Sequence, residues 1–108
     1  MTDYELLAAV AGDDPELLGA EYYDGPDPRY VGFFLIDKQR YWNPFTDDGD
    51  ALRLAVKRAI DISQDPNSRF VCASATDGAY IVEAYGDDPA AATRRAVVRA
   101  AIAQKGTP

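Results

Sequence analysis

The chain contains no histidine and only one cysteine, Cys72, among its 108 residues. Without an imidazole, Ser-His-Asp and Cys-His catalysis, histidine acid–base chemistry near neutral pH, and Cys/His zinc sites are all excluded. One cysteine cannot form an internal disulfide, which agrees with a reducing compartment. We therefore expect a protein that is not an enzyme and that holds neither a metal ion nor a cofactor.

The sequence also lacks an apolar run long enough for a membrane span. Its longest uncharged apolar stretch, residues 30–36, has the length of a strand, whereas a membrane helix needs about 20 apolar residues. The chain starts with Asp3 and Glu5 where a signal peptide needs positive charge. We expect no membrane partner and a location in the cytosol of a bacterial host.

The composition is that of a folded protein. Apolar residues make up 47% of the chain and charged residues 27%, so a chain of this length can bury a core without disulfide support. No linker, repeat or low-complexity segment is visible. We expect one domain over residues 1–108.

Charge is distributed unevenly. Residues 1–50 hold 12 acids and 3 bases, a net charge of −9, whereas residues 51–108 hold 6 acids and 8 bases, a net charge of +2. Binding to nucleic-acid phosphate depends on Lys and Arg, so direct nucleic-acid binding is not expected. An acidic half is instead suited to a protein partner with a basic surface.

Turn and cap signals predict the secondary structure. Asp77-Gly78 separates two β-prone runs as in a tight hairpin, and Asp88-Pro89 is typical of a helix start. The expected elements are a helix from residue 2 to 12, strands over 20–23, 29–36 and 39–42, a helix over 47–62, strands over 70–76 and 79–85, and a helix over 88–104.

The order α-ββ-α-ββ-α indicates the α+β class, with an antiparallel sheet of about four to five strands and helices packed on it. Because residues 29–36 are apolar on both faces, we expect helices on both sides of the sheet, as a three-layer sandwich.

Two segments support a family resemblance. The stretch from Trp42 to Leu52 leads into one helix, and the stretch from Asp88 to Ala101 opens the last one. Together they resemble small bacteriophage proteins described as an α-β-α sandwich domain, over roughly residues 40–104. The resemblance implies a phage accessory protein with a three-layer fold, and it implies no activity.

The acidic half supplies the candidate partner-binding residues. Trp and Tyr are common anchors of interfaces, and clustered acids can imitate nucleic-acid phosphate. We predict an inhibitor of a host defence system, similar in kind to anti-CRISPR proteins, that acts as a monomer or homodimer. Its predicted contact residues are Asp13, Asp14, Glu16, Glu21, Asp24, Asp27, Tyr22 and Trp42.

Two other functions stay open at this point. The protein could be a structural or assembly component of a phage that associates with its own copies. It could also be a small-molecule binding module for a nucleotide signal, which would need a local basic pocket from the helix over 47–62 or the last helix.

Three further clusters have ordinary structural explanations. Asp47, Asp48 and Asp50 are expected to cap a helix and match its dipole instead of holding a cation. Cys72 is expected to be a small core residue. The arginines of the last helix are expected to pair with acids of the same protein.

Overall fold

The computed structural model describes residues 2–12, 17, 19–27, 30–76 and 78–105. The elements run in the order α1 (Asp3–Ala11), β1 (Tyr22–Asp24), β2 (Val31–Leu35), the 3-10 helix η3 (Ile36–Lys38), β3 (Arg40–Trp42), α2 (Asp48–Arg58), β4 (Ile60–Asp65), β5 (Phe70–Ala75), β6 (Tyr80–Ala84) and α3 (Pro89–Lys105). Within the described ranges, every helix is too short or too polar to cross a membrane.

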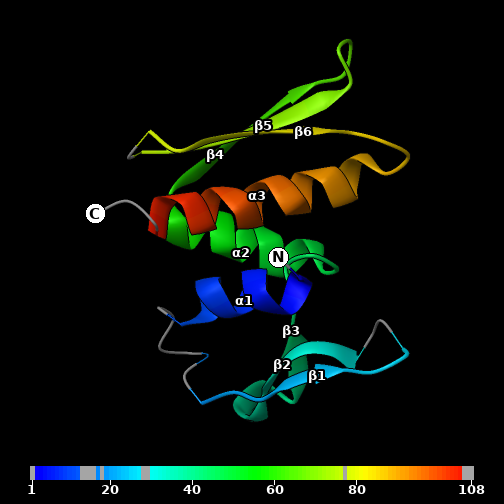
Figure 1. Cartoon of the computed structure of the whole chain (residues 1–108), viewed down its shortest axis with the longest axis vertical. Helices are drawn as coiled ribbons and strands as arrows, with labels where there is room; N and C mark the ends of the chain where they lie inside the picture. The colour runs from blue at the N-terminus through cyan, green and yellow to red at the C-terminus, as the bar shows by residue number, and fades with distance from the viewer. Residues whose placement is uncertain (1, 13–16, 18, 28–29, 77, 106–108) are drawn as a thin grey trace.

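The strands form two separate antiparallel sheets, and the α+β class is confirmed. Sheet A has the order β1-β2-β3, and sheet B has the order β4-β5-β6. The prediction of one sheet with four to five strands was therefore wrong. The helices lie between the two sheets, which occupy opposite ends of the molecule (Figure 1).

Strand β4 is the element that the sequence pattern missed. The helix predicted over residues 47–62 ends at Arg58, because Ala59 adopts a left-handed conformation with φ 54° and ψ 51°. Residues 60–65, expected to be the helix end and a loop, pair with β5 along their whole length. Ile60 continues the four-residue spacing of Leu52 and Val56, which suits a helix, but Ile60 and Ile62 also alternate as in a strand, and pairing with β5 selects the strand.

Helix α2 buries one face and exposes two apolar residues on another. Asp50, Ala51, Leu54 and Ala55 are its buried residues. Leu52 and Val56, one helical turn apart, have 61% and 74% of their surface exposed. As a result, α2 presents two apolar side chains to solvent.

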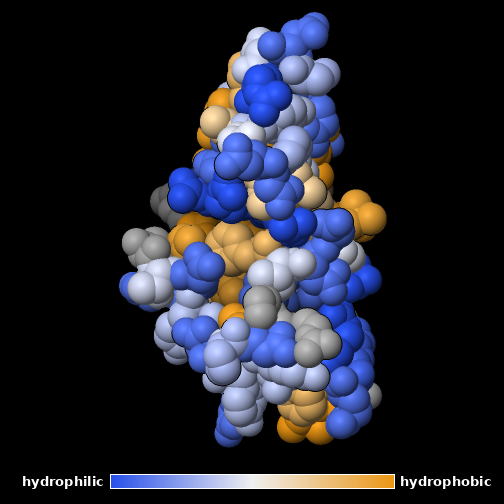
Figure 2. Space-filling model, turned by 90° about the vertical axis from the view of Figure 1, so that its right-hand side faces the viewer, coloured by the Kyte–Doolittle hydropathy of each residue, from blue (hydrophilic) through white to orange (hydrophobic). Residues whose placement is uncertain are grey.

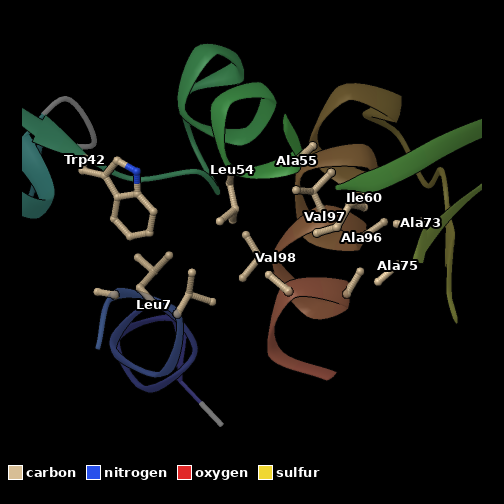
Figure 3. Close-up of a cluster of buried hydrophobic side chains, with 14 of the residues drawn as sticks. Leu7, Trp42, Leu54, Ala55, Ile60, Ala73, Ala75, Ala96, Val97 and Val98 are labelled. Atoms are coloured by element: carbon tan, nitrogen blue, oxygen red, sulfur yellow. The ribbon is translucent and has the colours of Figure 1, made fainter. Parts of the chain in front are cut away.

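One hydrophobic core connects both sheets through the helices. Figure 3 shows the core from Trp42 and Leu7 near sheet A, through Leu54 and Val98, to Ala73 and Ala75 of sheet B. Helix α3 crosses its centre and contacts all three strands of sheet B as well as α1 and α2. Its buried positions are alanines and valines, and these small side chains let the helix lie close to the sheet.

The predicted helix starts near residues 2 and 88 and the predicted hairpin are confirmed where the structure describes them. Thr2 and Glu5 form a capping box at the start of α1. Asp88 accepts a hydrogen bond from the Ala91 N–H at the start of α3. Strands β5 and β6 pair as a hairpin, whereas Asp77 of its turn lies outside the described residues.

Candidate protein-binding surface on sheet A

Strand alternation gives sheet A an inner face and an outer face. The register pairs Tyr22 with Phe33 and Phe33 with Trp42, and these side chains share the inner face, toward the helices. The same register pairs Phe34 with Tyr41 on the opposite, outer face. Helices α1, α2 and α3 all lie on the inner side (Figure 1), so none of these three helices covers the outer face. The expectation of helices on both sides of this strand was wrong.

Four aromatic side chains form what we call the outer aromatic face: Tyr23, Tyr30, Phe34 and Tyr41. Tyr41 stands at the centre, with its ring centroid 5.7 Å from Tyr23, 5.8 Å from Tyr30 and 5.0 Å from Phe34. Tyr23 and Tyr30 have 45% and 50% of their surface exposed, and Phe34 and Tyr41 are half-buried. The tilted and edge-to-face ring contacts orient these side chains relative to one another.

A carboxylate lies directly beside the outer aromatic face. The Phe34 N–H donates to the Glu21 carbonyl at 2.9 Å, which places Glu21 opposite Phe34 and on the same face. The Tyr23 hydroxyl donates to the Glu21 carboxylate at 3.1 Å. This hydrogen bond and the negative charge of Glu21 raise the pKa of the Tyr23 hydroxyl, so it stays neutral. The face therefore combines exposed rings with a fixed negative charge.

The remaining predicted acids are only partly placed. Asp24 is exposed at the end of β1, and Asp27 is half-buried in the following turn, where its carbonyl accepts the Tyr30 N–H. Both lie near sheet A, as does Glu21. Asp13, Asp14 and Glu16 lie outside the described residues.

The two predicted aromatic anchors point inward. Trp42 has only 8% of its surface exposed and belongs to the core. The half-buried Tyr22 ring packs between Tyr4 and Phe33, at centroid distances of 4.8 and 5.2 Å. The outward-facing members of the adjacent pairs Tyr22-Tyr23 and Tyr41-Trp42 are Tyr23 and Tyr41, which could not be predicted because alternation sends neighbours to opposite faces and the register was unknown.

A buried ion network fixes sheet A to α2. The Asp50 carboxylate is fully buried and accepts from both Arg40 amino groups, at 2.6 and 3.2 Å, and from Arg53 at 2.8 Å. It also accepts from the Asn43 backbone N–H at 2.9 Å. Burial raises the pKa of Asp50, but these donors outweigh burial and leave the pKa below its ordinary value. The network therefore joins β3, which carries Tyr41 of the outer aromatic face, to α2.

The other two acids of this segment have separate roles. Asp47 caps α2 by accepting from the Gly49 and Asp50 N–H groups, as predicted. Asp48 pairs with Arg94 of α3 at 2.6 Å. Among the described residues, no group of three or more Asp, Glu or Cys side chains is arranged to hold a metal ion.

Cys72 and the last helix complete the candidate residues. Val71 and Ala73 are fully buried toward the helices, so Cys72 points to the outer side of sheet B. There the hydroxyl of the exposed Tyr80 donates a hydrogen bond to the Cys72 Sγ at 3.0 Å. Cys72 was expected to be a core residue. It is buried, but it lies outside the central core.

Arg95 and Arg99 of the last helix both pair with Glu83 of β6, so the prediction of ion pairs within the protein is confirmed.

Comparisons of the chain with protein-family models, with curated proteins and with solved structures found no match. The resemblance to phage α-β-α sandwich proteins therefore stays a prediction.

Proposed function

We propose that this protein is a non-enzymatic binding protein and that its outer aromatic face docks on a basic surface of a partner protein. The observation that supports this proposal is the outer face of sheet A, where Tyr23 and Tyr30 are exposed and which none of the helices α1, α2 and α3 covers. Three tyrosines and one phenylalanine gather there beside Glu21, in the half of the chain that has a net charge of −9.

The chemistry of this face favours arginine and lysine side chains. The face of an aromatic ring attracts a guanidinium or ammonium group, and Glu21 can neutralise the same cation. Tyrosine and phenylalanine are enriched in interfaces, and they lose little conformational entropy because the sheet already orders them. Negative charge around the face accelerates encounter with a basic partner.

The same charge argues against two other partners. Nucleic acid would be repelled, since its phosphates carry the same sign as this half of the chain. A second copy would bring the same acids toward one another, which disfavours pairing through this face. A basic protein is therefore the partner that we propose.

The biological role that we propose is inhibition of a bacterial defence system by occupying a surface that normally holds nucleic acid. Its support is the acidic charge and the resemblance to phage proteins. The role predicts that bacteria expressing the protein lose protection against a phage or plasmid that their defence system otherwise restricts. If strains that carry the captured partner still restrict the phage or plasmid when they express the protein, the proposed role is contradicted. That result would not bear on the proposal that the outer aromatic face binds a basic protein, which has a separate test.

Affinity capture tests the binding proposal directly. Tagged protein should retain one basic bacterial protein at low salt and release it at high salt, because exposed charge contacts are screened. Changing Glu21→Lys should weaken the complex about tenfold or more, since it reverses the exposed charge beside the outer aromatic face.

The matched control changes one exposed acid of the other sheet, Asp61→Lys. It alters the net charge by the same amount, so it should leave affinity within about threefold. Equal weakening by the two variants would show that only net charge matters, and it would contradict a docking face on sheet A.

A further inference from the structure

Strand β6 forms one edge of sheet B, at the end of the molecule opposite to sheet A. The sheet has the order β4-β5-β6, so among the described strands β6 is paired on one side only. An edge strand presents a row of backbone N–H and C=O groups that can pair with a strand of another chain. Figure 2 shows apolar patches between hydrophilic areas at the end of the molecule that holds sheet B.

The hydrogen bonds at the two ends of the β5-β6 ladder define the pairing between them. The Ala75 N–H donates to the Ala79 carbonyl at 2.8 Å, and the Tyr85 N–H donates to the Arg69 carbonyl at 3.0 Å. Along an antiparallel ladder, pairs that exchange hydrogen bonds alternate with pairs that do not. Every second residue of β6, counted from either end, therefore bonds to β5.

The remaining residues of β6 direct their backbone groups to the open edge. Ile81 and Glu83 occupy the positions that bond to β5, so the N–H and C=O groups of Tyr80, Val82 and Ala84 point away from it. The side chains of these three residues lie on the outer face of sheet B, the side away from α3. All three are exposed, Tyr80 and Val82 by 63% and 51% of their surface. The edge thus combines backbone groups that sheet B does not use with uncharged, mostly apolar side chains.

The opposite edge of sheet B, β4, is protected by charge. Asp61 and Asp65 lie on the outer face of β4, and charged side chains on an edge strand discourage pairing with another chain. The single charged residue of β6, Glu83, lies on the inner face, where Arg95 and Arg99 neutralise it. Charge therefore makes β6 the edge of sheet B that is suited to accept a further strand.

We infer that β6 pairs in antiparallel orientation with β6 of a second copy of this chain, so that the two copies of sheet B form one continuous sheet. A two-fold axis at Val82 places this residue opposite its own copy. Tyr80 of each copy then lies opposite Ala84 of the other, so a large ring meets a small side chain. The uncharged row is therefore complementary to itself.

The distribution of charge also favours a second copy at this end of the molecule. The half of the chain that contains sheet B has a net charge of +2, whereas the half that contains sheet A has a net charge of −9. Pairing through β6 keeps the two acidic halves far apart, because the sheets occupy opposite ends of the molecule (Figure 1). The inference is independent of the proposed function, since each copy keeps its own outer aromatic face.

Sedimentation equilibrium of the full chain tests the inference first. One pair of short strands buries less surface than a standard stable interface, so the dimer Kd should lie between about 1 µM and 1 mM. The mass should rise with concentration from monomer to dimer and stop there, because a two-fold contact is closed. A monomer at about 1 mM, or growth into larger assemblies, would overturn the inference.

Hydrogen exchange of single amides distinguishes strand pairing from contact through a face. The amides of Tyr80, Val82 and Ala84 should exchange about threefold more slowly when two thirds of the chains are dimeric, since they exchange only from the monomer. Those of Ile81 and Glu83 should change less, because they already bond to β5. Protection of β4 or of α2, without this alternation in β6, would overturn the inference.

A pair of matched variants tests the position of the two-fold axis. Val82→Lys places two ammonium groups opposite each other, and it should raise the dimer Kd about tenfold or more. Val56→Lys makes the same change at an exposed valine of α2, and it should leave the dimer Kd unchanged. Both positions are exposed, so both variants should keep the circular dichroism spectrum of the wild type. Equal dimer Kd values for the two variants would overturn the inference.

Discussion

Changing Asp50→Asn should lower the free energy of unfolding by about 3 kcal/mol, the largest effect that we expect for a charged residue of this protein. The substitution preserves shape but removes the buried negative charge that holds Arg40 and Arg53. We expect the lower end of the range for broken buried ion pairs, because the Arg53 side chain is exposed and can be rehydrated. Chemical denaturation followed by Trp42 fluorescence measures the change.

Asp48→Asn is the matched control, because Asp48 lies in the same first turn of α2 but is exposed where it pairs with Arg94. Its loss should cost at most about 1 kcal/mol. Equal destabilisation by the two variants would show that Asp50 acts only through the helix dipole, which would contradict the buried-network explanation.

The Asp50 network also predicts how stability depends on pH. The folded-state pKa of Asp50 lies below its ordinary value of 3.8, so its ionised form stabilises the fold above that pH. This contribution should be lost as the pH falls below 3.8 and through the folded-state pKa. The difference in stability between wild type and Asp50→Asn should therefore be constant near neutral pH and shrink at acidic pH. A difference that grows on acidification would contradict the sign of this pKa shift.

Changing Gly32→Ala should destabilise the fold by about 3 kcal/mol or more. Gly32 lies in the middle strand of sheet A with φ +132°, a conformation that side-chain-bearing residues rarely adopt. An added Cβ would lie 2.4 Å from the Trp42 carbonyl oxygen of the neighbouring strand. The sheet would have to open there, which would disturb both the inner core and the outer aromatic face.

Gly25→Ala is the control for that prediction. A Cβ at Gly25 meets no atom within 4 Å, and its φ is not in the positive range. We expect a change of under about 0.5 kcal/mol. Thermal unfolding of the two variants provides the measurement, and a Gly32→Ala protein as stable as Gly25→Ala would contradict the close strand contact at Gly32.

The sequence predicted the local elements better than their assembly. Residues with a strong local signal were placed correctly, as the helix that begins after Thr2 and the start of α3 at Asp88-Pro89 show. Strand β4 was missed because Ile60 continues the helical spacing of Leu52 and Val56, and only pairing with β5 shows that Ile60 and Ile62 belong to a strand. The division into two sheets depends on the same pairing, so local patterns could not reveal it.

The candidate site could be predicted only at the level of its region and charge. The acidic, tyrosine-rich stretch around residues 21–42 does contain the surface that we propose. Its chemistry depends on which residue of each adjacent aromatic pair faces outward, and a register shift of one residue would exchange Tyr23 with Tyr22 and Tyr41 with Trp42. Asp50 was correctly placed in α2, but its burial could not be seen because its partner Arg40 comes from a different element.

The most direct test of the protein-binding function compares two exposed tyrosines in the affinity of the captured basic partner. Tyr23→Thr removes a ring from the outer aromatic face, and Tyr80→Thr removes an exposed ring from sheet B. Our account predicts that Tyr23→Thr raises the Kd about tenfold, as expected for an aromatic anchor, while Tyr80→Thr leaves it unchanged. Equal Kd values for the wild type and both variants would contradict a binding surface on the outer face of sheet A.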